Sequence, residues 1–370
     1  MAENGLAGIP NILRVSSPGR VCRFGEHQDY LGLPVVPLAI SLRVAVEGAR
    51  RADMNVNLDL PDIGSKDSFS LEGPLVYRQE RDYFRSAVKV MRRAGCTFSS
   101  GFDCVVHGDV PISAGTSSSS ALVVSWVSFL ARMSDEGREL APEECARLAH
   151  AAEVLEFDEP GGMMDQYTAS FGGLLSIAFH PAVRVERLDA SLGSFVLGDS
   201  GEPKDTMAIL ARVKNRVLAI TRRLAERNPE FSLHAAAGED VERFGGELTA
   251  EEKALLGGTI RNRDLTREAL SLLRGTSVDH RELGRLLGEH QTVLREILGI
   301  STPKIDALLD AALGAGAYGG KINGSGGGGC MFVYAPENAE AVARAIESAG
   351  GKAYIVHGDT GVRVDPPGRQ

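Results

Sequence analysis

A cluster of ionisable side chains lies in the N-terminal part of the chain. Glu26, His27 and Asp29 fall within four residues of one another, and Arg20 precedes them in residues 17–30 (SPGRVCRFGEHQDY). Carboxylates and an imidazole together accept and donate hydrogen bonds to several hydroxyl groups, as a polyol ligand requires. The triplet GEH is too short to be specific, so composition alone favours a polar surface loop.

A run of small residues, 111–122 (PISAGTSSSSAL), leads directly into an apolar segment that predicts a helix over residues 120–133. Small side chains let backbone N–H groups approach phosphate oxygens, and the dipole of the following helix favours negative charge. A serine hydroxyl at such a place can also ligate Mg²⁺. The alternative is a flexible serine-rich linker or a simple N-cap. Trp126 lies within the predicted helix, which places the serines inside a domain.

A third segment, residues 321–330 (KINGSGGGGC), is the densest glycine cluster of the chain. Residues 324–329 formally fit GxGxxG, but a polyglycine run fits almost any glycine pattern, and too little chain follows to complete a dinucleotide-binding fold. Ile322 follows Lys321 where a Walker A motif requires Ser or Thr. The segment therefore predicts only that the backbone closely approaches another group. A dinucleotide-dependent oxidoreductase is a distant alternative.

Taken together, the three segments resemble the motifs of the GHMP kinase superfamily, in the order of that family. GRVCRFGEHQDYLG resembles the galactokinase signature, PISAGTSSSS the phosphate-binding motif, and KINGSGGGGC the C-terminal glycine motif. A fourth segment, residues 161–166 (GGMMDQ), resembles the galactokinase G-I-M-D-Q sequence. The resemblance extends from Val15 to Val364 and so covers nearly the whole chain.

The resemblance implies an ATP site and a Mg²⁺ site. The residues expected to wrap the triphosphate are Gly115, Thr116, Ser117, Ser118, Ser119 and Ser120. Ser119 matches the serine that ligates Mg²⁺ in related kinases, and Glu153 matches their acidic Mg²⁺ ligand. Without the family, Glu153 is better explained as a solvated helix carboxylate.

The resemblance also implies a catalytic pair and a sugar site. Asp165 matches the proposed catalytic base and Arg20 the cation beside it. A carboxylate there can take the proton of the attacking hydroxyl or only orient it, and both roles remain open. The residues that match sugar ligands are Glu26, His27, Asp29 and Gly162.

Several positions depart from the galactokinase pattern and concern specificity. Cys22 and Arg23 replace the usual Asn-Leu, and residues 198–206 lack the tyrosine that contacts the sugar in galactokinases. One hypothesis is that Lys204 or Arg23 faces the pocket and selects an acidic sugar such as a uronate, because both cations bind carboxylates. The alternative is that both side chains point into solvent.

Composition sets the class of protein. A length of 370 residues predicts two or three domains, and a net charge of −9 argues against nucleic-acid or anionic-membrane partners. The five cysteines have no CxxC spacing, which argues against a disulfide framework or a zinc site. The chain has no secretory signal and no run of 18 apolar residues, so we expect a cytoplasmic protein.

Hydrophobic periodicity predicts an α+β protein with two lobes. Strands are predicted over residues 12–16, 35–39, 43–46, 102–107, 172–179, 184–188, 331–334 and 352–357. Helices are predicted over residues 82–94, 120–133, 142–156, 208–227, 250–273, 280–298, 304–312 and 339–349.

The resemblance implies the two-lobed GHMP kinase fold. Its N-terminal domain, residues 10–198, is expected to resemble the second domain of ribosomal protein S5 and to bind sugar and phosphate. Its C-terminal domain, residues 199–365, is expected to be ferredoxin-like, with the active site in the cleft between the two.

The function predicted from these observations is ATP-dependent phosphorylation of galactose or a related monosaccharide, by analogy at the anomeric hydroxyl. A kinase for an acidic sugar is one alternative. A mevalonate or homoserine kinase is another, although the 26–30 cluster argues against substrates that are not polyols. A non-catalytic sugar and ATP sensor is the third, and the presence of both Arg20 and Asp165 favours catalysis over it.

Overall fold

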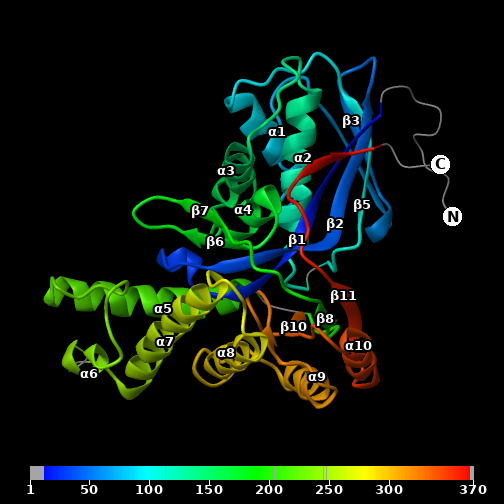
Figure 1. Ribbon diagram of the computed structural model, residues 1–370. Coiled ribbons are helices and arrows are strands. Elements are labelled where there is room, and N and C mark those ends of the chain that lie inside the picture. The colour runs from blue at the N-terminus through cyan, green and yellow to red at the C-terminus, as the bar shows by residue number, and fades with distance from the viewer. Residues whose placement is uncertain (1–11, 113, 204–205, 245, 247, 367–370) are drawn as a thin grey trace.

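The computed structural model describes residues 12–112, 114–203, 206–244, 246 and 248–366. Figure 1 shows two lobes, one above the other. The upper lobe is a sheet with helices against one face, and the lower lobe is a smaller sheet surrounded by helices. The mixed α and β composition and the two lobes confirm the fold class predicted from the sequence.

The upper sheet has the strand order β12-β1-β2-β5-β3-β4. The strands are β1 (Leu13–Phe24), β2 (Val36–Arg50), β3 (Asn55–Leu60), β4 (Ser65–Ser70), β5 (Phe102–Gly108) and β12 (Arg363–Asp365). All neighbours are antiparallel except β3 and β5, which are parallel. The last strand, β12, therefore returns the end of the described chain to the lobe in which it begins.

Four helices pack around this sheet: α1 (Tyr83–Arg93), α2 (Ser118–Met133), α3 (Pro142–Glu153) and α4 (Met164–Phe171). Helix α2 is apolar nearly all round, and a helix with that pattern is buried on every side. Its Trp126 stacks on Phe129 and donates its indole N–H to the carbonyl oxygen of Phe84 at 3.1 Å. This packing fixes the position of the serines at the N-terminus of α2.

The lower sheet is fully antiparallel, with the order β11-β8-β10-β9. Its strands are β8 (Phe195–Asp199), β9 (Gly319–Ile322), β10 (Cys330–Tyr334) and β11 (Lys352–Val356). The helices of this lobe are α5 (Thr206–Arg227), α6 (Asp240–Phe244), α7 (Ala250–Leu273), α8 (His280–Thr292), α9 (Pro303–Gly314) and α10 (Ala339–Ser348). A small hairpin of β6 (Leu175–Ala178) and β7 (Arg184–Arg187) lies beside the interface (Figure 1).

The two lobes share one hydrophobic core at their interface. Val21 and Phe24, at the end of β1, are fully buried in the same cluster as Phe195 of β8 and Phe332 of β10. Strand β1 therefore belongs to the upper sheet at its start and to the contact between the lobes at its end. The residues that follow Phe24 are held against both lobes.

Most predicted helices are confirmed to within a few residues, and the differences have physical causes. The strands predicted over 35–39 and 43–46 are one continuous strand, β2. The helix predicted over 280–298 changes after Thr292 into a π-helical turn over Val293–Ile297. Strand β8 was not predicted, and the predicted domain boundary between residues 198 and 199 falls inside it. The division into two domains stays a prediction.

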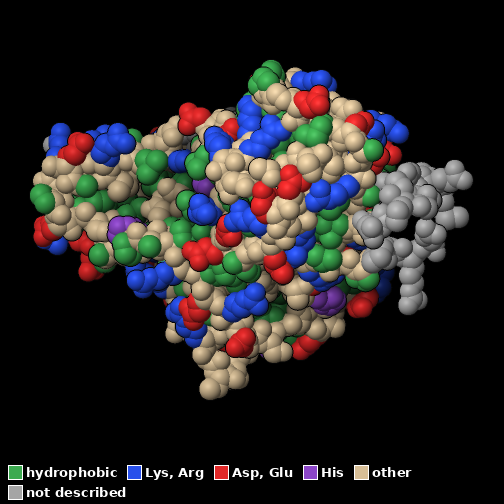
Figure 2. All heavy atoms as spheres, turned by 90° about the horizontal axis from the view of Figure 1, so that it is seen from above, with side chains coloured by type: hydrophobic (Ala, Val, Ile, Leu, Met, Phe, Trp, Pro, Cys, Tyr) green, Lys and Arg blue, Asp and Glu red, His purple; other side chains and the backbone are tan. Residues whose placement is uncertain are grey.

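The surface carries charges of both signs. Figure 2 shows Lys and Arg side chains interspersed with Asp and Glu on the face that it presents. In the described part of the chain, no helix is long and apolar enough to cross a membrane.

Arg23 lies buried at the lobe interface without a partner for its charge in the part of the chain that the structure describes. Its side chain is fully buried, with the guanidinium carbon 5.4 Å from the centroid of the Phe195 ring. Among the described residues, none accepts a hydrogen bond from Nε, Nη1 or Nη2 of Arg23. Burial lowers the pKa of Arg23 to about 9. A buried cation without a counter-charge destabilises the folded state.

Arg23→Met is therefore expected to raise the free energy of unfolding by about 1–3 kcal/mol, because it removes an uncompensated charge and keeps the volume. Urea denaturation measures the change. The matched control is Arg263→Met, since Arg263 is equally buried but donates to the carbonyl oxygen of Leu233 at 2.6 Å and to Asp264. Arg263→Met is expected to destabilise. A loss of stability in both variants would contradict this account of Arg23.

Candidate active site

A cavity of about 1420 Å³ lies beside the interface of the lobes. The end of β1 and the turn after it form one wall, the N-terminus of α2 the floor, and residues 159–166 a second wall. Gly324 and Ser325 reach it from the lower lobe. Segments far apart in sequence therefore meet in one place, as the spacing of the motifs predicts.

An ion pair between Arg20 and Asp165 lies at the centre of the cavity. Nε and Nη2 of Arg20 donate to Oδ1 and Oδ2 of Asp165 at 2.7 and 3.0 Å, a bidentate geometry. Nη1 donates to the carbonyl oxygen of Gly115 at 2.5 Å. Burial lowers the pKa of Arg20, but the charges of Asp165 and Glu26 outweigh burial, and the pKa is raised overall. Arg20 therefore stays cationic.

Asp29 presents a second carboxylate to the same cavity. Its Oδ1 accepts a hydrogen bond from the backbone N–H of Tyr30 at 2.9 Å. A Cβ atom on Gly162 would lie 1.8 Å from Oδ2 of Asp29, so this carboxylate occupies space that only glycine leaves open. Burial and the nearby charge of Asp165 raise the pKa of Asp29 to about 6. Hydrogen bonds donated by hydroxyl groups of a ligand would therefore stabilise the ionised form of Asp29.

Glu26 lines the cavity but is also tied to the lower lobe. Its Oε2 accepts a hydrogen bond from Nζ of Lys321 at 2.7 Å, and Oε1 accepts one from the backbone N–H of Gly324. Both charged groups are buried. This ion pair fastens the turn after β1 to strand β9 and to the glycine segment.

His27 makes a similar contact between the lobes. Its Nε2 lies 2.9 Å from the carbonyl oxygen of Ser325, which can only accept, so Nε2 carries the proton. Nδ1 then accepts from the hydroxyl of Tyr30 at 2.8 Å. Burial lowers the pKa of His27, which keeps the ring neutral.

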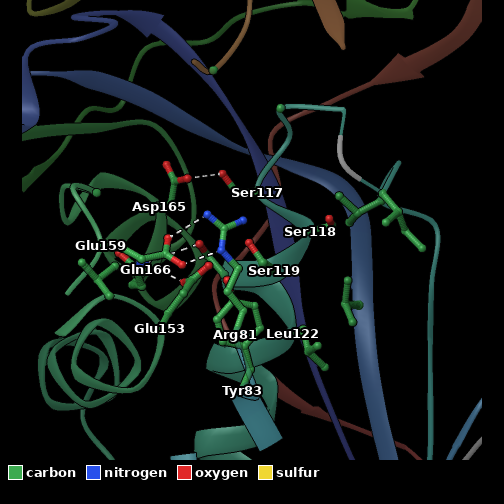
Figure 3. A pocket seen from close by; sticks show the side chains of 18 of the residues that line it. Arg81, Tyr83, Ser117, Ser118, Ser119, Leu122, Glu153, Glu159, Asp165 and Gln166 are labelled. Atoms are coloured by element: carbon green, nitrogen blue, oxygen red, sulfur yellow. Dashed lines mark hydrogen bonds and ion pairs between the residues drawn. The ribbon is translucent and has the colours of Figure 1, made fainter. Parts of the chain in front are cut away.

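The predicted phosphate loop lies at the cavity floor. Gly115 and the serines at 117–120 line the cavity, whereas the side chain of Thr116 is buried and donates to the carbonyl oxygen of Pro111 at 3.2 Å. Ser117 precedes α2 with a positive φ of 61°, and its Oγ donates to Oδ2 of Asp165 at 2.6 Å (Figure 3). The loop and the ion pair are thereby connected.

The glycine segment supports this loop from the lower lobe. A Cβ on Gly324, whose φ is +83°, would lie 2.9 Å from the carbonyl oxygen of Gly115. The backbone N–H of Cys330 donates to the carbonyl oxygen of Ala114 at 2.6 Å. Asn323 donates to the carbonyl oxygen of Gly115 at 2.8 Å. The close backbone approach predicted from the glycines is confirmed.

Ser119 and Glu153, the predicted Mg²⁺ ligands, both line the cavity. Glu153 is buried and accepts a hydrogen bond at Oε2 from Nε2 of Gln166 at 2.7 Å (Figure 3). Burial raises the pKa of Glu153, and a cation would reverse that effect. Within the described residues, no three His, Cys, Asp or Glu side chains gather to hold a metal. One hydroxyl and one carboxylate suit Mg²⁺, which takes few protein ligands and completes its shell with phosphate and water.

Comparison with known proteins identifies the family. Residues 82–173 match the model of the GHMP kinase N-terminal domain, and residues 269–352 match that of the GHMP kinase C-terminal domain. Residues 8–50 match the galactokinase galactose-binding signature. A mevalonate kinase from Thermococcus onnurineus is 30% identical, over 95% of this chain and 97% of its own. The chain belongs to the GHMP kinase superfamily. It is thus an ATP-dependent kinase.

The relatives of this kinase include both galactokinases and mevalonate kinases. A galactokinase from Roseiflexus sp. is 33% identical over 87% of the chain and 83% of its own. Among solved structures, the galactokinase of Lactococcus lactis in complex with galactose superposes with a TM-score of 0.82 at 20% identity, covering 96% of this chain and 95% of its own. The mevalonate kinase of Methanococcus jannaschii has a TM-score of 0.72 at 19% identity, covering 95% and 100%. The GHMP kinase fold is shared with both.

The structure brings together the residues predicted from the sequence, with two exceptions. Thr116 has a buried side chain, and Arg23 is enclosed between the lobes and does not line the cavity. The hypothesis that Arg23 faces the pocket is therefore wrong, and Lys204 lies outside the described residues. Sequence reasoning missed Lys321 as the partner of Glu26, and it missed Arg81, which also lines the cavity. Arg81 lies in none of the segments that resemble the family, and nothing in the glycine motif that begins with Lys321 indicates its pairing with Glu26.

Lys321→Met is expected to lower the free energy of unfolding by about 3–5 kcal/mol, because Glu26 is left as a buried charge without a partner. The double variant Glu26→Gln, Lys321→Met removes both charges and is expected to recover most of the loss. Urea denaturation of the three proteins tests this, with the exposed Lys352→Met as control. A double variant no more stable than Lys321→Met would show that the ion pair is not what holds this contact.

Proposed function

We propose that this kinase transfers the γ-phosphoryl group of ATP to a monosaccharide, galactose or a closely related sugar, at the anomeric hydroxyl. The observation that carries the proposal is the presence of two carboxylates with different partners in one cavity. Asp165 is paired with Arg20, whereas Asp29 has acceptor capacity left for hydroxyl groups. A sugar supplies several hydroxyl donors on one rigid ring. The match to the galactose-binding signature supports the same substrate class.

Asp165 is proposed to hold the attacking hydroxyl. Arg20 and Ser117 together donate three hydrogen bonds to its two oxygens, which fix the position of the carboxylate. This favours orientation of the hydroxyl over full removal of its proton before transfer. Phosphoryl transfer gains most of its acceleration from positioning and electrostatics, so such a role is sufficient. Arg20 can also stabilise negative charge on the transferring group.

The phosphates of ATP are proposed to lie at the N-terminus of α2, against Gly115 and the serines that follow. The first N–H groups of a helix have no partner within the helix, and the helix dipole favours anions at that end. Ser119 and Glu153 would hold Mg²⁺, which neutralises phosphate charge when bound. Thr116 contributes its backbone, since its side chain is buried.

Mevalonate is the second candidate substrate, because the identities to mevalonate kinases and to galactokinases are similar. Mevalonate also carries a hydroxyl that Asp165 could orient. Asp29 argues against it, since burying a second carboxylate beside a carboxylate substrate is unfavourable unless a cation intervenes. A uronate meets the same objection from Asp29. Lys214 of α5 interacts electrostatically with Asp29, but its Nζ already donates to the carbonyl oxygen of Pro160 at 2.7 Å.

ADP release with ATP and Mg²⁺ tests the proposal on a panel of galactose, arabinose, galacturonate, glucuronate and a heptose. Mevalonate and homoserine are the controls for substrate class. Asp165→Ala is expected to lose at least about 100-fold in kcat with the fold intact, because the hydroxyl is no longer oriented. Asp189→Ala, a change at an exposed carboxylate, should keep full activity.

Turnover of a neutral sugar that is lost in Asp165→Ala supports the proposal. Turnover of mevalonate alone contradicts it and assigns the protein to the other branch. ATP binding without turnover of any compound makes it a sugar and nucleotide sensor.

The pH dependence of kcat/KM for the sugar provides a second test. Asp29 has a pKa of about 6 and accepts hydroxyl hydrogen bonds best when ionised. As the pH falls below about 6, Asp29 takes up a proton, so kcat/KM should fall about tenfold per pH unit. Asp29→Asn should have low activity with no such slope. An unchanged profile in Asp29→Asn would exclude Asp29 as the group that titrates.

A further inference from the structure

Arg81 extends into the cavity from the segment just before α1. Figure 3 shows its guanidinium between Ser117 and Ser119 on one side and Glu159 on the other. The side chain is 43% exposed. Arg81 is also one of the described non-glycine residues with positive φ, at 57°, a conformation that is uncommon for such a side chain. Arg81 thus lines the same cavity as the serines against which the phosphates are proposed to lie.

The present partner of Arg81 is a carboxylate at the opposite lip of the cavity. Nε donates to Oε1 of Glu159 at 2.5 Å, and Nη2 donates to Oε2 at 3.2 Å. Burial lowers the pKa of Arg81, but the charges of Tyr83, Glu159 and Glu153 outweigh burial and raise it. The guanidinium is therefore cationic. A partly exposed ion pair of this kind contributes little to stability and is easily exchanged.

The cavity carries more negative than positive side chains, so a bound polyphosphate needs a further cation. Most ionisable side chains that line it are carboxylates, and the arginines and lysines among its described lining residues are Arg20 and Arg81. Arg20 is buried and is already hydrogen-bonded to Asp165 and to the carbonyl oxygen of Gly115. A triphosphate brings several further negative charges, which one Mg²⁺ neutralises only in part. Arg81 is the lining cation with a solvent-exposed, exchangeable partner.

We propose that Arg81 binds the β- or γ-phosphate of ATP and leaves Glu159 when the nucleotide enters. A guanidinium forms two parallel hydrogen bonds to a phosphate, as it does to a carboxylate, so the exchange keeps its geometry. Without a nucleotide, the ion pair with Glu159 keeps the guanidinium of Arg81 at the edge of the phosphate site. The inference depends on the phosphate site proposed above and not on the identity of the sugar.

Calorimetric titration with ATP, ADP and AMP tests the inference without any sugar. Arg81→Ala should weaken ATP and ADP binding by about 10-fold or more, the usual cost of a charged hydrogen-bonded contact, and change AMP binding less than about twofold. Arg81→Lys should recover part of the loss, because a lysine keeps the charge without the bidentate geometry. Glu159→Gln should bind ATP as tightly as the parent or more tightly, since Arg81 no longer has to leave a carboxylate.

A purely structural ion pair gives a different pattern. Arg81→Ala, Glu159→Gln and the double variant would then have equal effects on all three nucleotides, and the proposal would be overturned. Equal weakening of AMP and ATP would also overturn it. Melting temperatures of the variants show whether each remains folded. If the unaltered protein does not bind ATP, the proposed phosphate site is wrong. If it binds ATP but phosphorylates no sugar, the proposed sugar substrate is wrong, and the comparison of the Arg81 variants still tests the role of Arg81.

Discussion

The site depends on one electrostatic constraint, that the carboxylates of Asp29 and Asp165 line the same cavity. The charge of Asp165 raises the pKa of Asp29, and a cation beside Asp165 reduces that repulsion. Arg20 does this with a bidentate contact to Asp165, while a third bond to the carbonyl oxygen of Gly115 fixes its position. The charge of Asp29 is left for the ligand. The position of the Arg20 guanidinium on β1 therefore decides that Asp165 is paired and that Asp29 can accept hydrogen bonds from a ligand.

The contact between the lobes maintains this arrangement. The buried pair Glu26 and Lys321 and the bond from His27 to Ser325 attach the turn after β1 to the glycine segment of the lower lobe. That segment in turn supports the phosphate loop through Gly324 and Cys330. The turn that carries Asp29 and the loop that precedes α2 are thus parts of one connected structure. A change at the interface is expected to alter both.

The sequence predicted the chemistry of the site better than its contacts. Asp29, Asp165 and the serines of the phosphate loop were found because each lies in a local motif, and strongly periodic segments such as α2 and α7 were predicted for the same reason. Lys321 lies about 300 residues from Glu26, and no periodicity encodes such a pairing. Arg23 was assigned to the pocket because it departs from the galactokinase pattern and because a cation binds carboxylates, whereas the fold buries it in the lobe interface. Arg81 belongs to no motif, and its role emerges only from the fold.

Calorimetry of galactose binding at pH 6, in two buffers with different ionisation enthalpies, tests most directly whether Asp29 binds the sugar. About half of the Asp29 side chains are protonated at that pH, because their pKa is about 6. Hydroxyl donors favour the ionised form, so binding should release up to about half a proton per galactose, and Asp29→Asn should release none. Galactose binding without proton release, or with the same release in Asp29→Asn, would contradict the assignment of Asp29 as the sugar-binding carboxylate.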